Sequence, residues 1–109
     1  MNSEDFLKNF NNYLAKLAGI AVKENKLDQE KLFYFNDQLF AVLNLNREPY
    51  KLSVTCDKKL ANLLKSRYEE VVNPANLYPG KWITIILTGQ LSINEVLDLF
   101  RHAYEISQV

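Results

Sequence analysis

Hydrophobic residues recur at intervals of three and four in three stretches of the chain, and this spacing is typical of a helix with one buried face. The first stretch predicts a helix over about residues 4–18, with Ser3 as its N-cap and Gly19 as its C-terminal stop. The third has the clearest start, because Ser92 and Glu95 match a capping box. The second begins after Asp57, and its apolar stripe comprises Leu60, Leu64, Tyr68 and Val71.

Strand-like patterns lie between these helices. Two apolar runs at residues 32–35 and 39–43 predict a hairpin, since the Asn36-Asp37 pair between them tolerates the positive φ of a tight turn. Residues 52–56 then alternate between apolar and polar side chains, as a strand with one buried face requires. This alternation places Cys56 on the buried face.

The remaining segments complete an α+β pattern. Residues 82–87 form a β-rich run that we expect at the centre of a sheet, and the prolines within residues 73–80 predict a loop before it. Residues 20–30 fit a loop or an edge strand equally well. The order of helix, strands, helix, strand and helix predicts one α+β domain over residues 1–109, in which helices cover an antiparallel sheet.

Composition narrows the functional classes. The 109 residues include 13 Lys plus Arg and 13 Asp plus Glu, and this balance excludes a protein that holds polyanions by bulk charge alone. One Cys and one His form neither an internal disulfide nor a four-ligand structural zinc site, and three scattered glycines exclude a Gly-rich nucleotide loop. We therefore expect no cofactor. The acidic N-terminal residues and the lack of a long apolar run predict a cytoplasmic protein.

Positive charge is concentrated in one stretch despite the overall balance. Residues 47–67 carry six Lys or Arg against two Asp or Glu, and Lys81 follows the predicted loop. Lys58 and Lys65 share one line on the second helix, opposite its apolar stripe, where they could contact phosphates. A solvated helix face explains the same pattern, with Lys65 and Glu69 as an ordinary i to i+4 pair, and charge alone favours this second interpretation.

Aromatic residues beside this stretch add a second element of a nucleic-acid site, because single strands are held by stacking as well as by charge. Tyr50 and Tyr78 lie next to prolines in predicted loops, and Trp82 opens the central strand, where it either packs or lines a groove. The candidate nucleic-acid-binding residues are Lys51, Lys58, Lys59, Lys65, Arg67, Lys81, Tyr50, Tyr78 and Trp82.

The sequence offers little support for an enzyme. His102 projects away from the apolar face of the last helix, so we expect it to be exposed among carboxylates rather than placed in a cleft. Cys56 would need a nearby base to act as a nucleophile, and its buried strand position predicts a structural role instead. We expect no catalytic and no metal-binding residues.

Taken in order, several short motifs resemble the MmcQ/YjbR-like proteins, a family of small bacterial domains associated with DNA binding. The similarity covers residues of about 31 to 108. The residues that carry it are Leu39-Phe40-Ala41-Val42-Leu43, Lys51-Leu52-Ser53-Val54-Thr55-Cys56-Asp57, Asn73-Pro74-Ala75, Gly80-Lys81-Trp82, Leu91-Ser92 and His102-Ala103-Tyr104. This resemblance implies an α+β fold, a double-wing mode of DNA contact and no cofactor.

Two functions from different classes follow. The first is weak, salt-sensitive binding of DNA through the local basic surface, without an assigned base-specific contact. The second is a protein interaction or assembly module, because the predicted hairpin over residues 31–43 is rich in Phe and Tyr and would pair with another chain if its edge were exposed.

Overall fold

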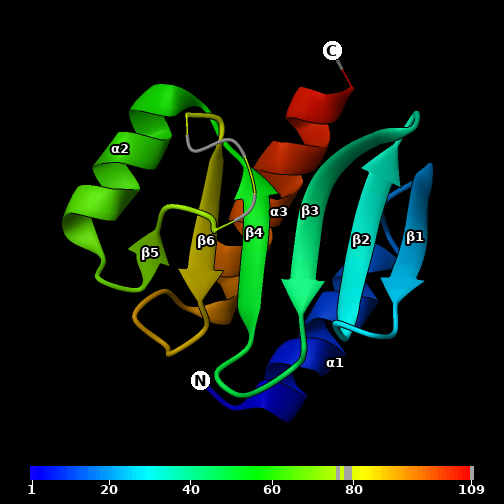
Figure 1. The fold of residues 1–109 in the computed structure, drawn as a ribbon, viewed down its shortest axis with the longest axis horizontal. Helices are drawn as coiled ribbons and strands as arrows, with labels where there is room; N and C mark the ends of the chain where they lie inside the picture. Colours follow the sequence, from blue (N-terminus) through cyan, green and yellow to red (C-terminus); the bar gives the residue numbers. More distant parts are fainter. Residues whose placement is uncertain (76, 78–79, 109) are drawn as a thin grey trace.

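A computed structural model describes residues 1–75, 77 and 80–108 of the chain. In the described part, a six-stranded sheet is packed against helices on one side (Figure 1). The elements in chain order are α1 (Ser3–Leu14), β1 (Ile20–Asn25), β2 (Glu30–Phe35), β3 (Gln38–Asn44), β4 (Lys51–Thr55), α2 (Lys58–Arg67), β5 (Val71–Val72), β6 (Trp82–Ile86) and α3 (Ile93–Ser107).

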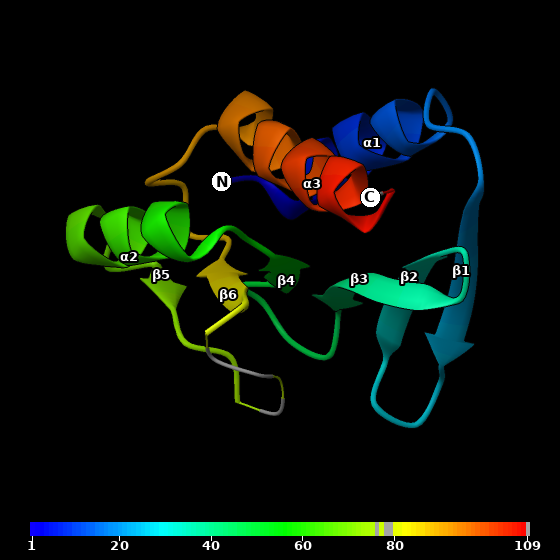
Figure 2. The same ribbon diagram turned by 90° about the horizontal axis from the view of Figure 1, so that it is seen from above.

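The strands follow the order β1-β2-β3-β4-β6-β5, and all neighbouring pairs are antiparallel. The first four form a meander, after which the chain passes through α2 and β5 and returns along β6 beside β4. Figure 2 shows α1 and α3 over one face of the sheet. The described residues 73–75 and 77, which follow β5, lie on the other face. The predicted α+β fold with an antiparallel sheet is confirmed.

Aromatic side chains fix the helices to the sheet. The rings of Phe10 in α1, Phe33 in β2 and Phe100 in α3 meet edge to face, with centroids 4.9 to 5.5 Å apart. None of the three is more than 1% exposed. Such pairs contribute free energy beyond the burial of their area, and here they join both helices to one strand. Because both helices lie on one face of the sheet, the side chains on the opposite face do not take part in this packing.

Several local predictions are confirmed. Asn36 and Asp37 have φ values of 48° and 63° in the turn between β2 and β3. Ser92 and Glu95 form the expected capping box at the start of α3. Residues 20–25, for which the sequence left two alternatives, form the edge strand β1.

The ends of two helices differ from the predictions. The first helix stops at Leu14 rather than at residue 18. The second stops at Arg67, because Tyr68 is extended with φ −124° and ψ 121°, and Val71 pairs with Ile85 of β6 instead of continuing the helical stripe. Residues 68–71 of the expected second helix thus become a link and the first residue of a short strand.

The buried carboxylate of Glu70 explains why the chain leaves the helix there. Only 4% of this residue is exposed, and the carboxylate accepts hydrogen bonds from the Thr88 hydroxyl at 2.7 Å and from the backbone N–H of Gln90 at 2.6 Å. The Glu70 backbone N–H donates in turn to Gln90 Oε1 at 2.9 Å. These hydrogen bonds join Glu70 to the segment before α3 and stabilise an extended backbone at this position. A longer helix would not allow them.

The hairpin expected to offer a free edge is flanked on both sides. β2 pairs with β1, and β3 pairs with β4, so the interaction edge predicted at residues 31–43 is wrong. The free edge on that side of the sheet belongs to β1. None of the described helices is both long and apolar enough to cross a membrane.

Candidate functional site

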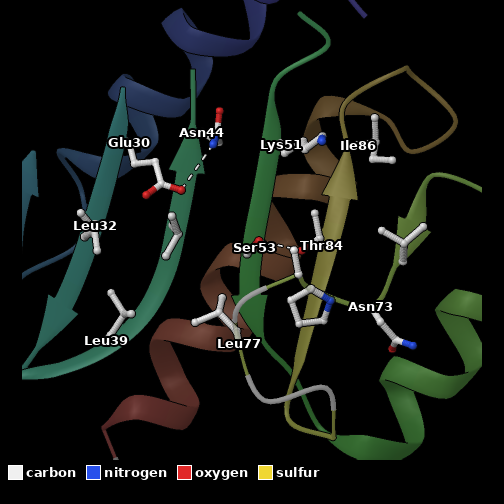
Figure 3. Close-up of a pocket in the computed structure, with 14 residues that line it drawn as sticks. Glu30, Leu32, Leu39, Asn44, Lys51, Ser53, Asn73, Leu77, Thr84 and Ile86 are labelled. Atoms are coloured by element: carbon white, nitrogen blue, oxygen red, sulfur yellow. Dashed lines mark hydrogen bonds between the residues drawn. The ribbon is translucent and has the colours of Figure 1, made fainter. Parts of the chain in front are cut away.

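Figure 2 shows which face of the sheet lies opposite α1 and α3. This face forms the floor of a hollow of about 350 Å³, whose lining residues Figure 3 shows. Strand alternation decides which side chains reach it. In β4, Leu52 and Val54 point into the core and are fully buried, so Lys51 and Ser53 point into the hollow. The same rule in β6 turns Thr84 outward between its buried neighbours.

One end of the hollow is polar. The strand register places Glu30, Asn44, Lys51 and Ile86 side by side across four strands. The Asn44 amide Nδ2 donates to Glu30 Oε2 at 3.3 Å, as Figure 3 shows, and Lys51 is exposed in the next position. This row therefore presents one carboxylate and one ammonium group to the solvent.

The middle of the hollow combines aliphatic and hydroxyl groups. The next row contains Leu32, Val42, Ser53 and Thr84, and the hydroxyl oxygens of Ser53 and Thr84 are 2.7 Å apart. Thr84 is only 8% exposed. A nearly buried hydroxyl pair is thus set in an otherwise apolar floor.

The segment after β5 forms the remaining wall. Pro74, Ala75 and Leu77 line the hollow on the side away from the strands, and Figure 3 shows Leu77 near the Ser53–Thr84 pair. Asn73, at the start of this segment, accepts a hydrogen bond of 2.8 Å from Lys65 Nζ. Lys65 therefore does not form the expected helical pair with Glu69, which lies beyond the end of α2.

The six cationic candidates lie at separate points of the structure. Lys51 lines the hollow, and Lys65 reaches its rim through Asn73. Lys81 is exposed just before β6, and its carbonyl accepts from the Cys56 N–H, at the end of β4 remote from Lys51. The others, Lys58, Lys59 and Arg67, are exposed along α2. Of these six residues, Lys51 is the one among the described residues that line the hollow, and Lys65 is linked to it only through Asn73. The structure does not gather the six cations into one patch.

The predicted aromatic residues contribute less than expected. The Trp82 side chain is 8% exposed and packs, so its ring offers little surface for stacking. Tyr50 is half-buried against the core, and Tyr78 lies outside the described residues. Sequence reasoning missed Tyr34, which pairs with hollow-lining Leu39 and so lies on the uncovered face.

Lys23 Nζ lies 4.9 Å from the centroid of the Tyr34 ring, a cation–π contact. Alternation along the strands was the signal that could have identified Tyr34, Ser53 and Thr84 as members of one face. What the sequence alone does not provide is the register that brings strands far apart in the chain into one row.

The two residues weighed as catalytic groups lie outside the hollow. Burial raises the pKa of the Cys56 thiol to about 11, with a smaller contribution from the Asp57 carboxylate, so the thiol stays protonated at neutral pH. The prediction that Cys56 is buried is confirmed. His102 is half-buried in a groove between α2 and α3, and its Nε2 has no hydrogen-bond partner among the described residues. The expectation that His102 is exposed rather than in a cleft is wrong, because Leu60 and Leu64 of α2 line the groove around it. The expected neighbouring carboxylates, Glu95 and Asp98, do line this groove.

The described residues contain no group of three or more His, Cys, Asp or Glu that could hold a metal ion.

Comparisons with known proteins identify relatives of this fold. A YjbR family model matches residues 17–106, a longer span than the motifs cover. The crystal structure of the Deinococcus radiodurans protein DR2400, with a DUF419 domain, aligns with a TM-score of 0.82 and 16% identity over 92% of this chain and 76% of that one. A Pseudomonas syringae protein aligns with a TM-score of 0.76 and 18% identity over 98% and 99%. No curated protein matches the chain.

Proposed function

Because the chain belongs to the YjbR family, we propose that it is a non-catalytic protein that binds nucleic acid weakly through the uncovered face of its sheet. The placement of Lys51 in the hollow, beside the Ser53–Thr84 hydroxyl pair, carries this proposal. Exposed antiparallel sheet faces with stacking and polar side chains are a common platform for single-stranded nucleic acids.

The cationic side chains have distinct roles in this proposal. Lys51 contacts a phosphate at the polar end of the hollow, and Lys65 does so at the rim formed with Asn73. The exposed cations of α2 and Lys81 extend the contact around the edge of the sheet, in the double-wing arrangement that the family resemblance implies. The negative charge of the Glu30 carboxylate repels a phosphate near Lys51, and this repulsion agrees with weak rather than tight binding.

Binding without catalysis fits the position of the reactive groups. His102 belongs to the groove between α2 and α3, on the helix side of the sheet, and Cys56 is a protonated thiol in the core. Neither lines the hollow. The groups that do line it, hydroxyls, amides, one ammonium and one carboxylate, bind and orient a ligand more readily than they activate a bond.

Fluorescence anisotropy with short labelled oligonucleotides at low salt tests the proposal. We expect the single strand to bind and the affinity to fall as salt rises, since each neutralised phosphate releases counterions. The variant Lys51→Glu with Lys65→Glu should lose most of this binding. Its control is Lys8→Glu with Lys16→Glu, an equal charge change at exposed residues in and just after α1. An absence of binding by the parent protein, or equal losses in both variants, would overturn the proposal.

A protein partner is the second candidate function, and the free edge of β1 favours it. β1 pairs with β2 on one side only, Val22 is 45% exposed, and Leu27 in the adjoining turn is 92% exposed. Backbone groups on such an edge can pair with an extended segment of another protein. Binding of a purified partner protein to the parent, together with loss of that binding in the variant Val22→Lys, would support this function. A chain that sediments as a monomer and retrieves no partner would leave it without support.

A further inference from the structure

We infer that the hollow receives one unstacked base of a bound single strand, an assignment that rests on the proposed function. The hollow lies at the lower end of the volumes that small-ligand sites occupy, at about 350 Å³. Its size thus suits one ring system better than an extended run of bases.

The walls suit a flat ring. Leu32 and Val42 form the aliphatic floor on the strand side, while Pro74 and Leu77 line the hollow on the opposite side. Figure 3 labels Leu32 and Leu77. An aromatic base buries apolar area on both of its faces between such surfaces. Stacking and face contacts of this kind tolerate any of the four bases, which agrees with a protein that has no assigned sequence preference.

The hydroxyl pair supplies the polar edge that a base requires. A single hydrogen bond joins Ser53 and Thr84, and it consumes one of their two O–H donors, so the accepting hydroxyl keeps a donor for another partner. Thr84 is 8% exposed and Ser53 is half-buried, so this donor has limited access to solvent whichever of the two hydroxyls carries it. Polar atoms on a base edge would satisfy it, whereas an aliphatic side chain in the same place would leave it unpaired at a cost in free energy.

The position of Lys51 fits the phosphate of the same nucleotide. Lys51 precedes Ser53 by two residues in β4, so both side chains point to the same face, one pleat apart. A base held at the hydroxyl pair would direct its sugar and phosphate toward this ammonium group at the open, polar end. Lys23 and Tyr34, beyond Leu32 and Leu39, provide a further cation and ring for the adjacent nucleotide.

The experiment compares a labelled single-stranded oligonucleotide with a strand of equal length in which abasic sites replace the bases. Both carry the same phosphates, so their difference in affinity reports the bases alone. We expect the parent to bind the base-containing strand about tenfold more tightly, as loss of one stacked base implies. In Ser53→Ala with Thr84→Val this ratio should fall toward one, while the salt dependence stays unchanged.

Matched controls separate a loss of the site from a loss of the fold. Replacement of both hydroxyl partners leaves neither unpaired, so the double variant should melt close to the parent. Ser66→Ala, an exposed hydroxyl on α2, should keep the parent ratio. A further variant, Leu77→Ala, enlarges the hollow in a surface segment and should lower the ratio even if the double variant is unstable.

The outcomes distinguish this inference from the function on which it rests. Equal binding of the two strands by the parent would overturn the base site and leave nucleic-acid binding in place. No binding of either strand at low salt would overturn both. Free thymidine monophosphate should displace the strand only at much higher concentration. Saturation by this mononucleotide at the affinity of the strand would contradict the assignment to a strand.

Discussion

The Glu70 carboxylate accepts a hydrogen bond of 2.7 Å from the Thr88 hydroxyl, across 18 positions of sequence. The same oxygen, Oε1, accepts from the Gln90 backbone N–H, which joins the end of α2 to the segment that leads into α3. Thr88 and Gln90 lie in the segment that connects β6 with α3. β6 supplies Thr84 to the hollow and α3 supplies Phe100 to the core, so the buried carboxylate stabilises the connection between the two layers.

Glu70→Ala should lower the free energy of unfolding by about 3 kcal/mol, because it leaves buried donors without an acceptor. Urea denaturation followed by circular dichroism measures the change. Glu69→Ala, the exposed neighbour, should stay within about 0.5 kcal/mol of the parent. Similar losses in the two variants would contradict a specific role for the Glu70 contacts.

Glu30→Gln should strengthen binding of single-stranded DNA by up to about fivefold at low salt, because it removes the negative charge in the row that contains Lys51. Glutamine keeps an oxygen that can accept from Asn44, so the local structure should persist. The measurement is an anisotropy titration at two salt concentrations. Glu105→Gln, exposed on α3, is the control, and an equal gain there would indicate a general effect of net charge.

Cys56 should resist alkylation by iodoacetamide in the folded protein at pH 8 and react quickly in urea, because its pKa of about 11 leaves almost no thiolate. The raised pKa also makes the free energy of unfolding depend on pH in the alkaline range. The contribution of the buried, protonated thiol to the free energy of unfolding is fully present below the unfolded pKa of about 8.5. This contribution is lost as pH rises through the pKa of the thiol in the folded protein.

Denaturation of the parent and of Cys56→Ala at pH 7 and pH 10.5 tests this dependence. The parent should lose more stability between the two pH values than the variant does, although Cys56→Ala is less stable overall because it removes a buried side chain. Equal pH dependence of the two proteins would show that the thiol does not titrate as stated.

Ser92→Ala should destabilise the protein by about 1 kcal/mol at neutral pH, the usual effect of removing an N-cap. Its hydroxyl accepts from the Glu95 N–H at 3.1 Å, and the Ser92 N–H donates to Glu95 Oε1 at 3.0 Å. The hydrogen bonds from Ser92 lower the pKa of Glu95, so the stability they provide is present above the unfolded pKa of about 4.3 and is lost as pH falls through the folded value.

Measuring stability as the pH is lowered tests the Glu95 carboxylate of the capping box separately from the Ser92 hydroxyl. Glu95→Gln keeps a side-chain oxygen that can accept from the Ser92 N–H but removes the charge, so its stability should depend less on pH between 5 and 3 than that of the parent. Thermal melts across this interval provide the comparison. An unchanged acid dependence in Glu95→Gln would contradict the role of the ionised carboxylate.

The sequence by itself determined the class of fold and most of the elements. Helical periodicity, the Asn36-Asp37 turn and the Ser92 capping box act within a few residues, so the chain needs no distant contact to express them. Alternation in β4 likewise decided that Cys56 points inward. These signals are local, and local physical chemistry is what a single sequence contains.

Tertiary structure decided the end of α2, the free edge and the hollow. Helical spacing alone continued the second helix to Val71, whereas in the structure Glu70 bonds to residues 88–91 and Val71 pairs with Ile85 of β6. The hollow depends on the register that sets Ser53 of β4 against Thr84 of β6, and on residues 73–75 and 77, which line its other side. Pairing between strands distant in the chain is a property of the whole fold, because each partner's position depends on the packing of all the others.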